Sequence, residues 1–397
     1  MNNDMDNIRK HYKKVTKALR RFKHPDPFFL TKYQFSPYMA CQHACKYCDG
    51  RAEKYYVQGD YEKDIVIRSN LPELLKKELS GLREMGIIGI GSGISDPYQP
   101  LEKDELITGK ALAILKDHNF PISIHTKSHF LLRDIDLIEK LQQKTGVIIF
   151  LSLTTLNDDT RRIFEPGAPT VNQRLKTIQE LKKRGIPIGI LAMPFLPFIS
   201  DQRENISELF SKLSSMKIDF VLPWFLTLRP GKQKAVFLKV LYKFDPNLSA
   251  AYEELYSNKL PSGMPIQEYR KTFKTKIDKL LAEYDLISQV PHHLYKKIML
   301  NYDQIFILLH HMMNLYPKSR ISRLKKAAQK YFNWLNKEKE FYNRHRSRSF
   351  TELEHKLIYL LESGKMADII ENKRLTDLMK SITIDNLTFD YHTRTLN

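Results

Sequence analysis

Residues 32–48 read KYQFSPYMACQHACKYC, a short β-like run followed by three cysteines on one compact loop. The chain contains no other cysteine, and Cys41, Cys45 and Cys48 all lie within eight residues. A secreted disulfide framework would spread more cysteines along the chain. The cluster therefore indicates a metal or redox site in a reducing compartment.

Five further β-like runs follow this first one, and longer helical patterns separate them. The six predicted strands span residues 32–35, 87–90, 122–125, 147–153, 188–193 and 220–225. The helical patterns between them span residues 71–85, 103–117, 134–144, 172–184 and 205–216. This alternation is typical of βα units repeated around a parallel sheet. We therefore predict an α/β fold built on a partial (βα)6 barrel.

Beyond about residue 235 the β pattern fades and helical patterns remain, at residues 266–284, 294–313 and 350–363. We expect three parts. They are a basic N-terminal arm over residues 1–30, a barrel core over residues 31–255, and a mainly helical, basic C-terminal extension over residues 256–397.

The net charge of +19 is concentrated outside the barrel core. Residues 1–40 carry a net +6, residues 41–260 a net +4 and residues 261–397 a net +9. A basic tail of residues 318–348, from Lys318 at its start to Arg348 at its end, interleaves these charges with aromatic residues. Such a pattern suits a phosphate backbone with bases to stack, and it equally suits a basic helix with an aromatic stripe facing a core.

The composition also bears on where the protein works. The first 23 residues are charged throughout, with no apolar core of signal-peptide type. No stretch approaches the roughly 20 uncharged apolar residues that a membrane helix needs. We expect a soluble protein that stays in the cytoplasm and has no membrane partner.

The loops after the predicted strands are where ligands bind in such folds, and the cysteines occupy the first of them. A zinc site would need a fourth ligand, for which His43 is badly placed, although a distant histidine could supply it. A four-iron cluster held by three thiolates instead leaves one iron open to chelate a substrate or cofactor.

The spacing Cys41-x-x-x-Cys45-x-Tyr47-Cys48 resembles the cluster motif of the radical S-adenosylmethionine superfamily. Four further stretches are similar to the branch that contains spore photoproduct lyase and the proteins called DNA repair photolyases. They are residues 36–68, residues 96–100 (DPYQP), Glu165-Pro166 with Pro169 after it, and residues 185–189 (GIPIG). The resemblance covers roughly residues 30–255.

This resemblance implies a cofactor set and a role for several residues. The three cysteines would hold a [4Fe-4S] cluster whose open iron chelates S-adenosylmethionine, and a flavodoxin or ferredoxin type of electron donor would reduce it. Seven other side chains or glycines would contact S-adenosylmethionine. Tyr47 would pack beside the adenine, Lys127 would pair with the methionyl carboxylate, and the others are Ser92, Gly93, Asp96, Ser152 and Met193. Glu165 and Arg174 are polar neighbours that we expect to pair structurally.

The sequence departs from the branch at one chemically important point. Spore photoproduct lyase returns a hydrogen atom from a fourth cysteine in the loop after the second strand, and this chain has no fourth cysteine. Tyr98 lies in that loop and is the phenolic substitute that we expect, with Tyr55 and Tyr56 as further candidates.

Three functions follow as hypotheses. The first is a radical S-adenosylmethionine enzyme that abstracts hydrogen from a nucleic acid bound through the basic arm and tail. The second keeps the radical chemistry but acts on a protein, peptide or small metabolite. The third is a non-enzymatic nucleic-acid-binding protein with a structural metal.

Overall fold

A twisted parallel sheet forms the centre of the structure, a computed structural model that describes residues 8–91, 93–258, 260–316 and 321–397. The seven strands run in the order β10-β9-β8-β7-β6-β3-β2, and all neighbours except β2 and β3 are parallel. Their bounds are β2 (Arg20–Arg21), β3 (Tyr33–Phe35), β6 (Ile88–Ile90), β7 (Ile122–Thr126), β8 (Val147–Ser152), β9 (Ile188–Phe195) and β10 (Phe220–Phe225). The six predicted strands and the α/β fold class are confirmed.

Five helices connect the parallel strands and cover the outer face of the sheet. They are α1 (Leu71–Ser80), α3 (Ile107–His118), α4 (Ile135–Lys144), α6 (Val171–Lys183) and α7 (Arg203–Ser215). Side chains alternate between the two faces of a strand, so Ile149 and Leu151 of β8 pack against these helices. Ile148 and Phe150 point to the other face. Both faces of the sheet are therefore buried.

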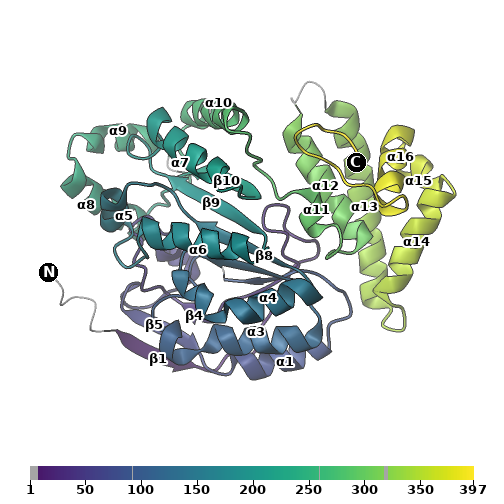
Figure 1. Cartoon of the computed structure of the whole chain (residues 1–397), viewed down its shortest axis with the longest axis horizontal. Helices are drawn as coiled ribbons and strands as arrows, with labels where there is room; N and C mark the ends of the chain where they lie inside the picture. Colours follow the sequence, from purple (N-terminus) through teal and green to yellow (C-terminus); the bar gives the residue numbers. More distant parts are fainter. Residues whose placement is uncertain (1–7, 92, 259, 317–320) are drawn as a thin grey trace.

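The C-terminal helices cover that second face and form a helical body at one end of the molecule (Figure 1). This body comprises α11 (His292–Tyr295), α12 (Asn301–Leu315), α13 (Ser322–Arg344), α14 (Phe350–Glu362), α15 (Lys365–Ile370) and α16 (Lys373–Thr383). Its core cluster includes Phe150 and Phe220 of the sheet. The extension is thus continuous with the barrel rather than attached to its surface.

The boundaries of the three predicted parts differ from the packing that the structure shows. Helix α10 (Gln267–Glu283) buries Phe273 and Ile277 in the cluster of the barrel, so the barrel continues past residue 255. The helix predicted over residues 294–313 is broken before α12, because Ile298 to Leu300 leave the helical path and pack into the second core cluster.

The described part of the predicted N-terminal arm lies folded on the barrel. Strand β1 (Arg9–Lys13) pairs in parallel with β5 (Asp64–Arg68), which also pairs with β4 (Tyr38–Met39) in a small second sheet. Arg9 Nε donates to Asp64 Oδ1 at 2.6 Å, and Lys10 Nζ lies 2.9 Å from Glu105 Oε1. Part of the arm's charge is therefore neutralised by the core.

Helix α13 contains most of the predicted basic tail, whose first residues, Lys318 among them, lie outside the described residues. Four of the five aromatic side chains in the tail are buried in the second core cluster. They are Tyr331, Phe332, Trp334 and Tyr342. Only Phe341 is substantially exposed, at 43%. The aromatic stripe thus faces the core, and four of its rings are not free to stack on bases.

A buried charge cluster joins the C-terminal helices to the barrel. Lys339 of α13 is fully buried, and its Nζ lies 2.6 Å from Glu84 Oε1 and 2.7 Å from Asp303 Oδ1. Lys32 Nζ lies 3.0 Å from the other oxygen of Glu84.

Within the described residues, no helix is long and apolar enough to span a bilayer.

We predict that Lys339→Ala lowers the free energy of unfolding by about 3–5 kcal/mol, because it leaves a buried carboxylate without its cation. Urea denaturation measures this loss, with the fluorescence of Trp334 as the reporter in a Trp224→Phe background. The matched control is Lys337→Ala at an exposed position of the same helix, expected to stay within about 0.5 kcal/mol. Equal effects of the two substitutions would contradict this role of Lys339.

Candidate active site

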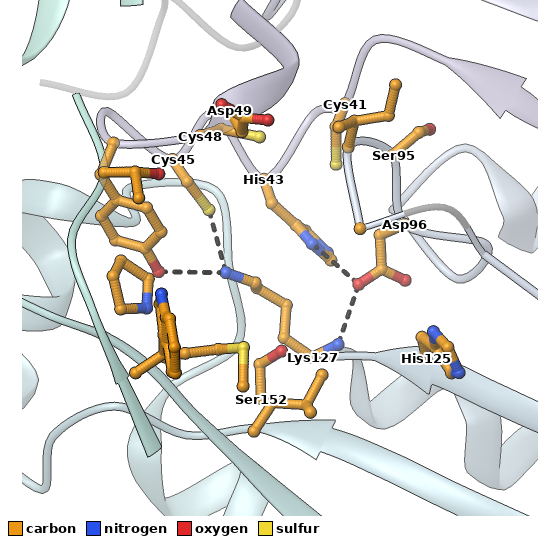
Figure 2. A pocket seen from close by; sticks show the side chains of 18 of the residues that line it. Cys41, His43, Cys45, Cys48, Asp49, Ser95, Asp96, His125, Lys127 and Ser152 are labelled. Carbon is orange, nitrogen blue, oxygen red and sulfur yellow. Dashed lines mark hydrogen bonds and ion pairs between the residues drawn. The ribbon is translucent and has the colours of Figure 1, made fainter. Parts of the chain in front are cut away.

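An open cavity lies at the carboxyl ends of the parallel strands, where the loops after β3, β6, β7 and β8 converge (Figure 2). Its empty volume is about 1040 Å³, part of it continuous with solvent. All three cysteines line it.

Tight backbone geometry holds the cysteine loop in place. Ala40 and Ala44 adopt left-handed φ angles of 65° and 55°, which non-glycine residues rarely do. The buried Arg51 guanidinium donates to the carbonyl oxygens of Ala44 and Cys45 at 3.1 and 2.8 Å. Gly167 approaches so closely that a Cβ atom there would lie 2.0 Å from the carbonyl oxygen of Gln42. Arg51 and Gly167 therefore hold the backbone of the loop at two separate points.

The three thiols are free of disulfides, and two have a polar partner at their sulfur. Cys45 Sγ lies 3.1 Å from Lys127 Nζ, and Cys48 Sγ lies 3.0 Å from the hydroxyl of Tyr61. Burial raises the pKa of the Cys41 and Cys45 thiols, an effect that the charge of Lys127 partly offsets at Cys45. Metal coordination removes such a proton outright.

A row of buried and partly buried charges runs from Cys45 into the sheet. Lys127 Nζ lies 3.2 Å from the Tyr47 hydroxyl and 3.3 Å from Glu165 Oε1. Glu165 accepts a hydrogen bond from Tyr47 and pairs with Arg174 through its other oxygen. Glu165 and Arg174 are only 2% and 1% exposed. The expected pairing of Glu165 with Arg174 is present, and it extends to Lys127.

Charge balance explains why Glu165 stays ionised although it is buried. Burial alone would raise the pKa of Glu165, but the positive charges of Arg174 and Lys127 outweigh it and hold that pKa well below its usual range. The same carboxylate and Cys45 outweigh the burial of Lys127 and raise the pKa of its ammonium. The site therefore keeps a cation beside the cysteine loop at neutral pH.

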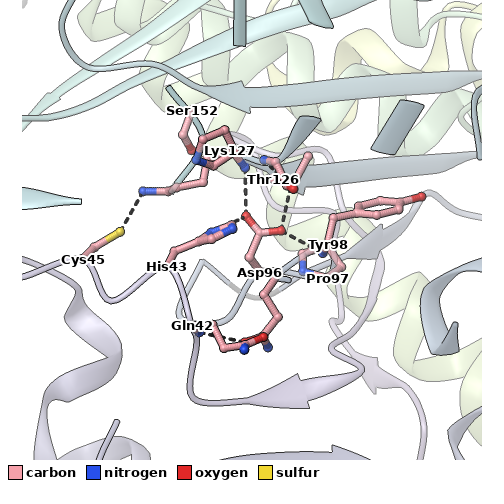
Figure 3. Close-up of polar contacts among 12 residues, drawn as sticks. Gln42, His43, Cys45, Asp96, Pro97, Tyr98, Thr126, Lys127 and Ser152 are labelled. Atoms are coloured by element: carbon pink, nitrogen blue, oxygen red, sulfur yellow. Dashed lines mark hydrogen bonds and ion pairs between the residues drawn. The ribbon is translucent and has the colours of Figure 1, made fainter. Parts of the chain in front are cut away.

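Asp96 organises the loop after β6 (Figure 3). Its Oδ1 accepts hydrogen bonds from the Thr126 hydroxyl at 2.6 Å and the Tyr98 amide at 2.8 Å. Its Oδ2 accepts from the Lys127 amide at 2.8 Å and lies 3.4 Å from His43 Nδ1. A carboxylate offers about four acceptor positions. A ligand amino group that bound the Asp96 carboxylate would therefore share that carboxylate with four groups of the chain itself.

The other expected ligand contacts mostly line the same cavity. Tyr47, Gly93, Asp96, Lys127, Ser152 and Met193 all do so. Gly93 has a φ angle of 72°, and no atom lies within 4 Å of where its Cβ would be, so the backbone there is open to a ligand. Ser92 lies outside the described residues.

Tyr98 does not line the cavity, which corrects its expected position. Its side chain is fully buried, and its hydroxyl donates to Asp134 Oδ2 at 3.0 Å, directed away from Asp96 and Lys127 (Figure 3). The turn at Asp96 that binds the Tyr98 amide sends the ring into the barrel core. A hydroxyl in that position does not reach a substrate in the cavity, so Tyr98 is not retained as hydrogen donor.

The structure adds four residues to the site that the sequence pattern does not single out. Tyr61, Phe29, His125 and Trp224 all line the cavity. Phe29 packs on His125 with ring centroids 4.7 Å apart and closes the inner wall. Burial lowers the pKa of His125 to about 3, so its imidazole is neutral. His125 and Trp224 lie at the ends of predicted strands and so had a positional signal, whereas Phe29 and Tyr61 had none.

Comparisons with known proteins agree with this geometry. A family model described as the radical SAM superfamily matches residues 35–210. A protein of Methanocaldococcus jannaschii, described as uncharacterized, is 30% identical over 247 residues, which are 62% of this chain and 87% of that protein. The chain belongs to the radical SAM superfamily. An uncharacterized protein of Mycobacterium tuberculosis is 29% identical over 262 residues. These residues are 64% of this radical SAM chain and 75% of the mycobacterial protein.

Among solved structures, spore photoproduct lyase complexed with dinucleoside spore photoproduct is similar, with a TM-score of 0.50 and 14% identity. The match covers 69% of this chain and 79% of the lyase. At this identity the likeness establishes the shared radical SAM fold.

The residues present fit the groups that radical SAM proteins bind. Three free thiols on one clamped loop are the donor set of an iron–sulfur cluster with an open iron. Across the ranges that the structure describes, no three Cys, His, Asp or Glu side chains lie close enough to share a single metal ion. In a cluster each thiolate binds a different iron, so the thiols need no common point. Lys127, which lines the cavity beside them, suits the carboxylate of a cofactor.

We predict that Cys41→Ala, Cys45→Ala and Cys48→Ala each lose most of the iron and sulfide that the wild-type chain takes up on anaerobic reconstitution. Iron and sulfide analysis and the absorbance near 400 nm measure this. Tyr98→Phe is the control, expected to keep full iron content because Tyr98 lies outside the cavity. Full iron content in any of the alanine variants would contradict the assignment of that cysteine.

We also predict that Glu165→Gln destabilises the protein by about 3–5 kcal/mol at pH 7, because the buried Arg174 and the partly buried Lys127 lose their shared anion. The native pKa of Glu165 is lowered, so its stabilisation is complete above the ordinary glutamate pKa of about 4.3 and is lost as the pH falls further. Glu139→Gln is the control, since it breaks an exposed pair with Arg184 worth under about 1 kcal/mol. Urea denaturation at pH 7 and at a pH below about 4.3 distinguishes the Glu165 variant from the Glu139 control.

Proposed function

We propose that this chain is an enzyme that uses a [4Fe-4S] cluster and S-adenosylmethionine to abstract a hydrogen atom from a nucleic acid. The observation that carries the chemistry is the convergence of three free thiols and a partly buried lysine on one cavity, at the carboxyl ends of a parallel sheet. When bound, the reduced cluster supplies the electron that splits S-adenosylmethionine into methionine and a 5′-deoxyadenosyl radical.

The chain's own residues would bind and orient this cofactor. Lys127 is held by Cys45, Tyr47 and Glu165, so its ammonium would meet the methionyl carboxylate from a fixed position. The Met193 side chain and the Tyr47 ring would border the adenosine. The apolar share of the lining would exclude water from a reactive radical.

The nucleic acid as substrate is supported by charge and by the cavity rim. The net charge of +19 favours a polyanion. Trp224 lines the cavity while 44% exposed, and its ring stacks on Phe225 with centroids 4.8 Å apart. A rim aromatic of this kind can stack on a base that is single-stranded or flipped. The buried aromatics of α13 do not contribute to this proposal.

The proposal is tested by incubating the reconstituted chain with S-adenosylmethionine and dithionite and measuring 5′-deoxyadenosine. We expect formation by the wild type and none by Cys45→Ala. Lys127→Ala is expected to raise the KM for S-adenosylmethionine at least about tenfold, because a charge-assisted hydrogen bond to the carboxylate is lost.

The substrate class is tested by adding cellular RNA, DNA or protein fractions to the same reaction. We expect a single-stranded nucleic-acid fraction to accelerate 5′-deoxyadenosine formation, and substrate deuterium to appear in the product. Trp224→Ala should abolish this acceleration while leaving the basal rate unchanged. Acceleration by the protein or small-molecule fraction alone would replace the nucleic acid with that class.

A further inference from the structure

The charged side chains of helix α8 (Lys232–Phe244) are all positive. It contains four lysines and no acidic residue. Lys232, Lys239 and Tyr242 lie on its exposed face at helical spacing, with Lys243 beside them. Tyr242 is 65% exposed. Within the described residues, Lys239 and Lys243 form no ion pair with a carboxylate.

The opposite face of α8 packs directly on the cysteine loop. The buried Gln233 amide donates to the backbone carbonyl of Tyr47 at 2.9 Å, one residue before Cys48. Phe237 and Leu241 are fully buried and share a core cluster with Cys45. One helix therefore connects a basic surface to the backbone that holds the thiols.

Acidic residues near the start of α8 already have partners. Asp49 Oδ1 accepts a hydrogen bond from Arg229 Nε at 2.5 Å, and Glu53 Oε1 accepts one from the backbone amide of Lys232 at 2.8 Å. The next helix, α9 (Leu248–Leu255), adds Glu253 and Glu254. Residues 229–258 as a whole contain five basic and three acidic side chains, so the corner stays positive.

The basic face of α8 is separate from the cavity. All residues of α8 are described, and none of them lines the cavity. Figure 1 shows α8 at one end of the molecule and the basic helix α13 toward the other. A substrate must enter the cavity to meet the radical, whereas a reductant needs only to approach the cysteine loop. The position of α8 therefore favours a redox partner over a nucleic acid.

We propose that the exposed face of α8 is the docking surface for an acidic one-electron carrier protein of the flavodoxin type. This proposal rests on the proposed function, which consumes one electron for each cleavage. Unpaired lysines around an exposed aromatic suit a transient, electrostatically steered encounter, which needs only a small interface. In the step, one electron passes from the flavin hydroquinone to the cluster, and the carrier leaves as its semiquinone. No bond in either protein forms or breaks.

The test is stopped-flow reduction of the anaerobically reconstituted full chain by a flavodoxin hydroquinone, followed through the cluster absorbance. We expect Lys239→Glu/Lys243→Glu to lower the second-order rate constant at least about tenfold at low salt. We expect the wild-type rate constant to fall as salt is added, and the variant to lose most of that dependence. The control is Lys325→Glu/Lys326→Glu, the same charge change at exposed positions of α13, which should stay within about twofold of wild type.

Dithionite separates this proposal from the proposed function. As a small reductant it needs no docking surface, so all variants should reduce at the wild-type rate and form equal 5′-deoxyadenosine. An unchanged flavodoxin rate constant in the α8 variant would overturn the docking proposal. Loss of single-stranded nucleic-acid binding in that variant, with reduction unchanged, would also overturn it. Absence of 5′-deoxyadenosine in the dithionite-reduced wild type would instead refute the proposed function.

Discussion

A single buried carboxylate ties the cysteine loop to the sheet. Glu165 joins Arg174 on one side to Lys127 and Tyr47 on the other, and Lys127 in turn contacts the sulfur of Cys45. The charges alternate along this row once Cys45 is a thiolate. Burying such a row is favourable only when every charge has its partner, since each unpaired charge costs several kcal/mol. The arrangement is therefore balanced for a chain whose cysteine carries negative charge, as a metal ligand does.

The barrel and its site were predictable from the sequence to the extent that local pattern determines them. Strands such as 147–153 are continuous apolar runs because both faces of the sheet are buried, and such runs stand out between amphipathic helices. The cysteine spacing predicted a metal or redox site because three thiols on one loop have few other uses. Lys127 and Ser152 both line the cavity because parallel strands bring their carboxyl ends to the same edge of the sheet.

What could not be predicted depends on long-range packing. The direction of Tyr98 follows from a turn closed by Asp96, which a residue pattern does not reveal. The aromatics of α13 suit stacking on bases and packing in a core equally well, and the partner surface on Phe150 and Phe220 decided between them. The N-terminal arm shows no strand pattern of its own, because its exposed strand β1 is defined by pairing with β5.

Three regions of the molecule thus have different roles around one cluster of thiols. The cavity would hold cofactor and substrate, the C-terminal helices close the second face of the sheet, and α8 links the cysteine loop to a basic surface. The central claim is that three thiolates hold a cluster with one open iron. Mössbauer spectroscopy of the iron-labelled, anaerobically reconstituted chain tests it most directly. One of four iron sites should change its spectrum when S-adenosylmethionine is added. Four iron sites that all remain unchanged, or a chain that takes up no cluster, would contradict the account.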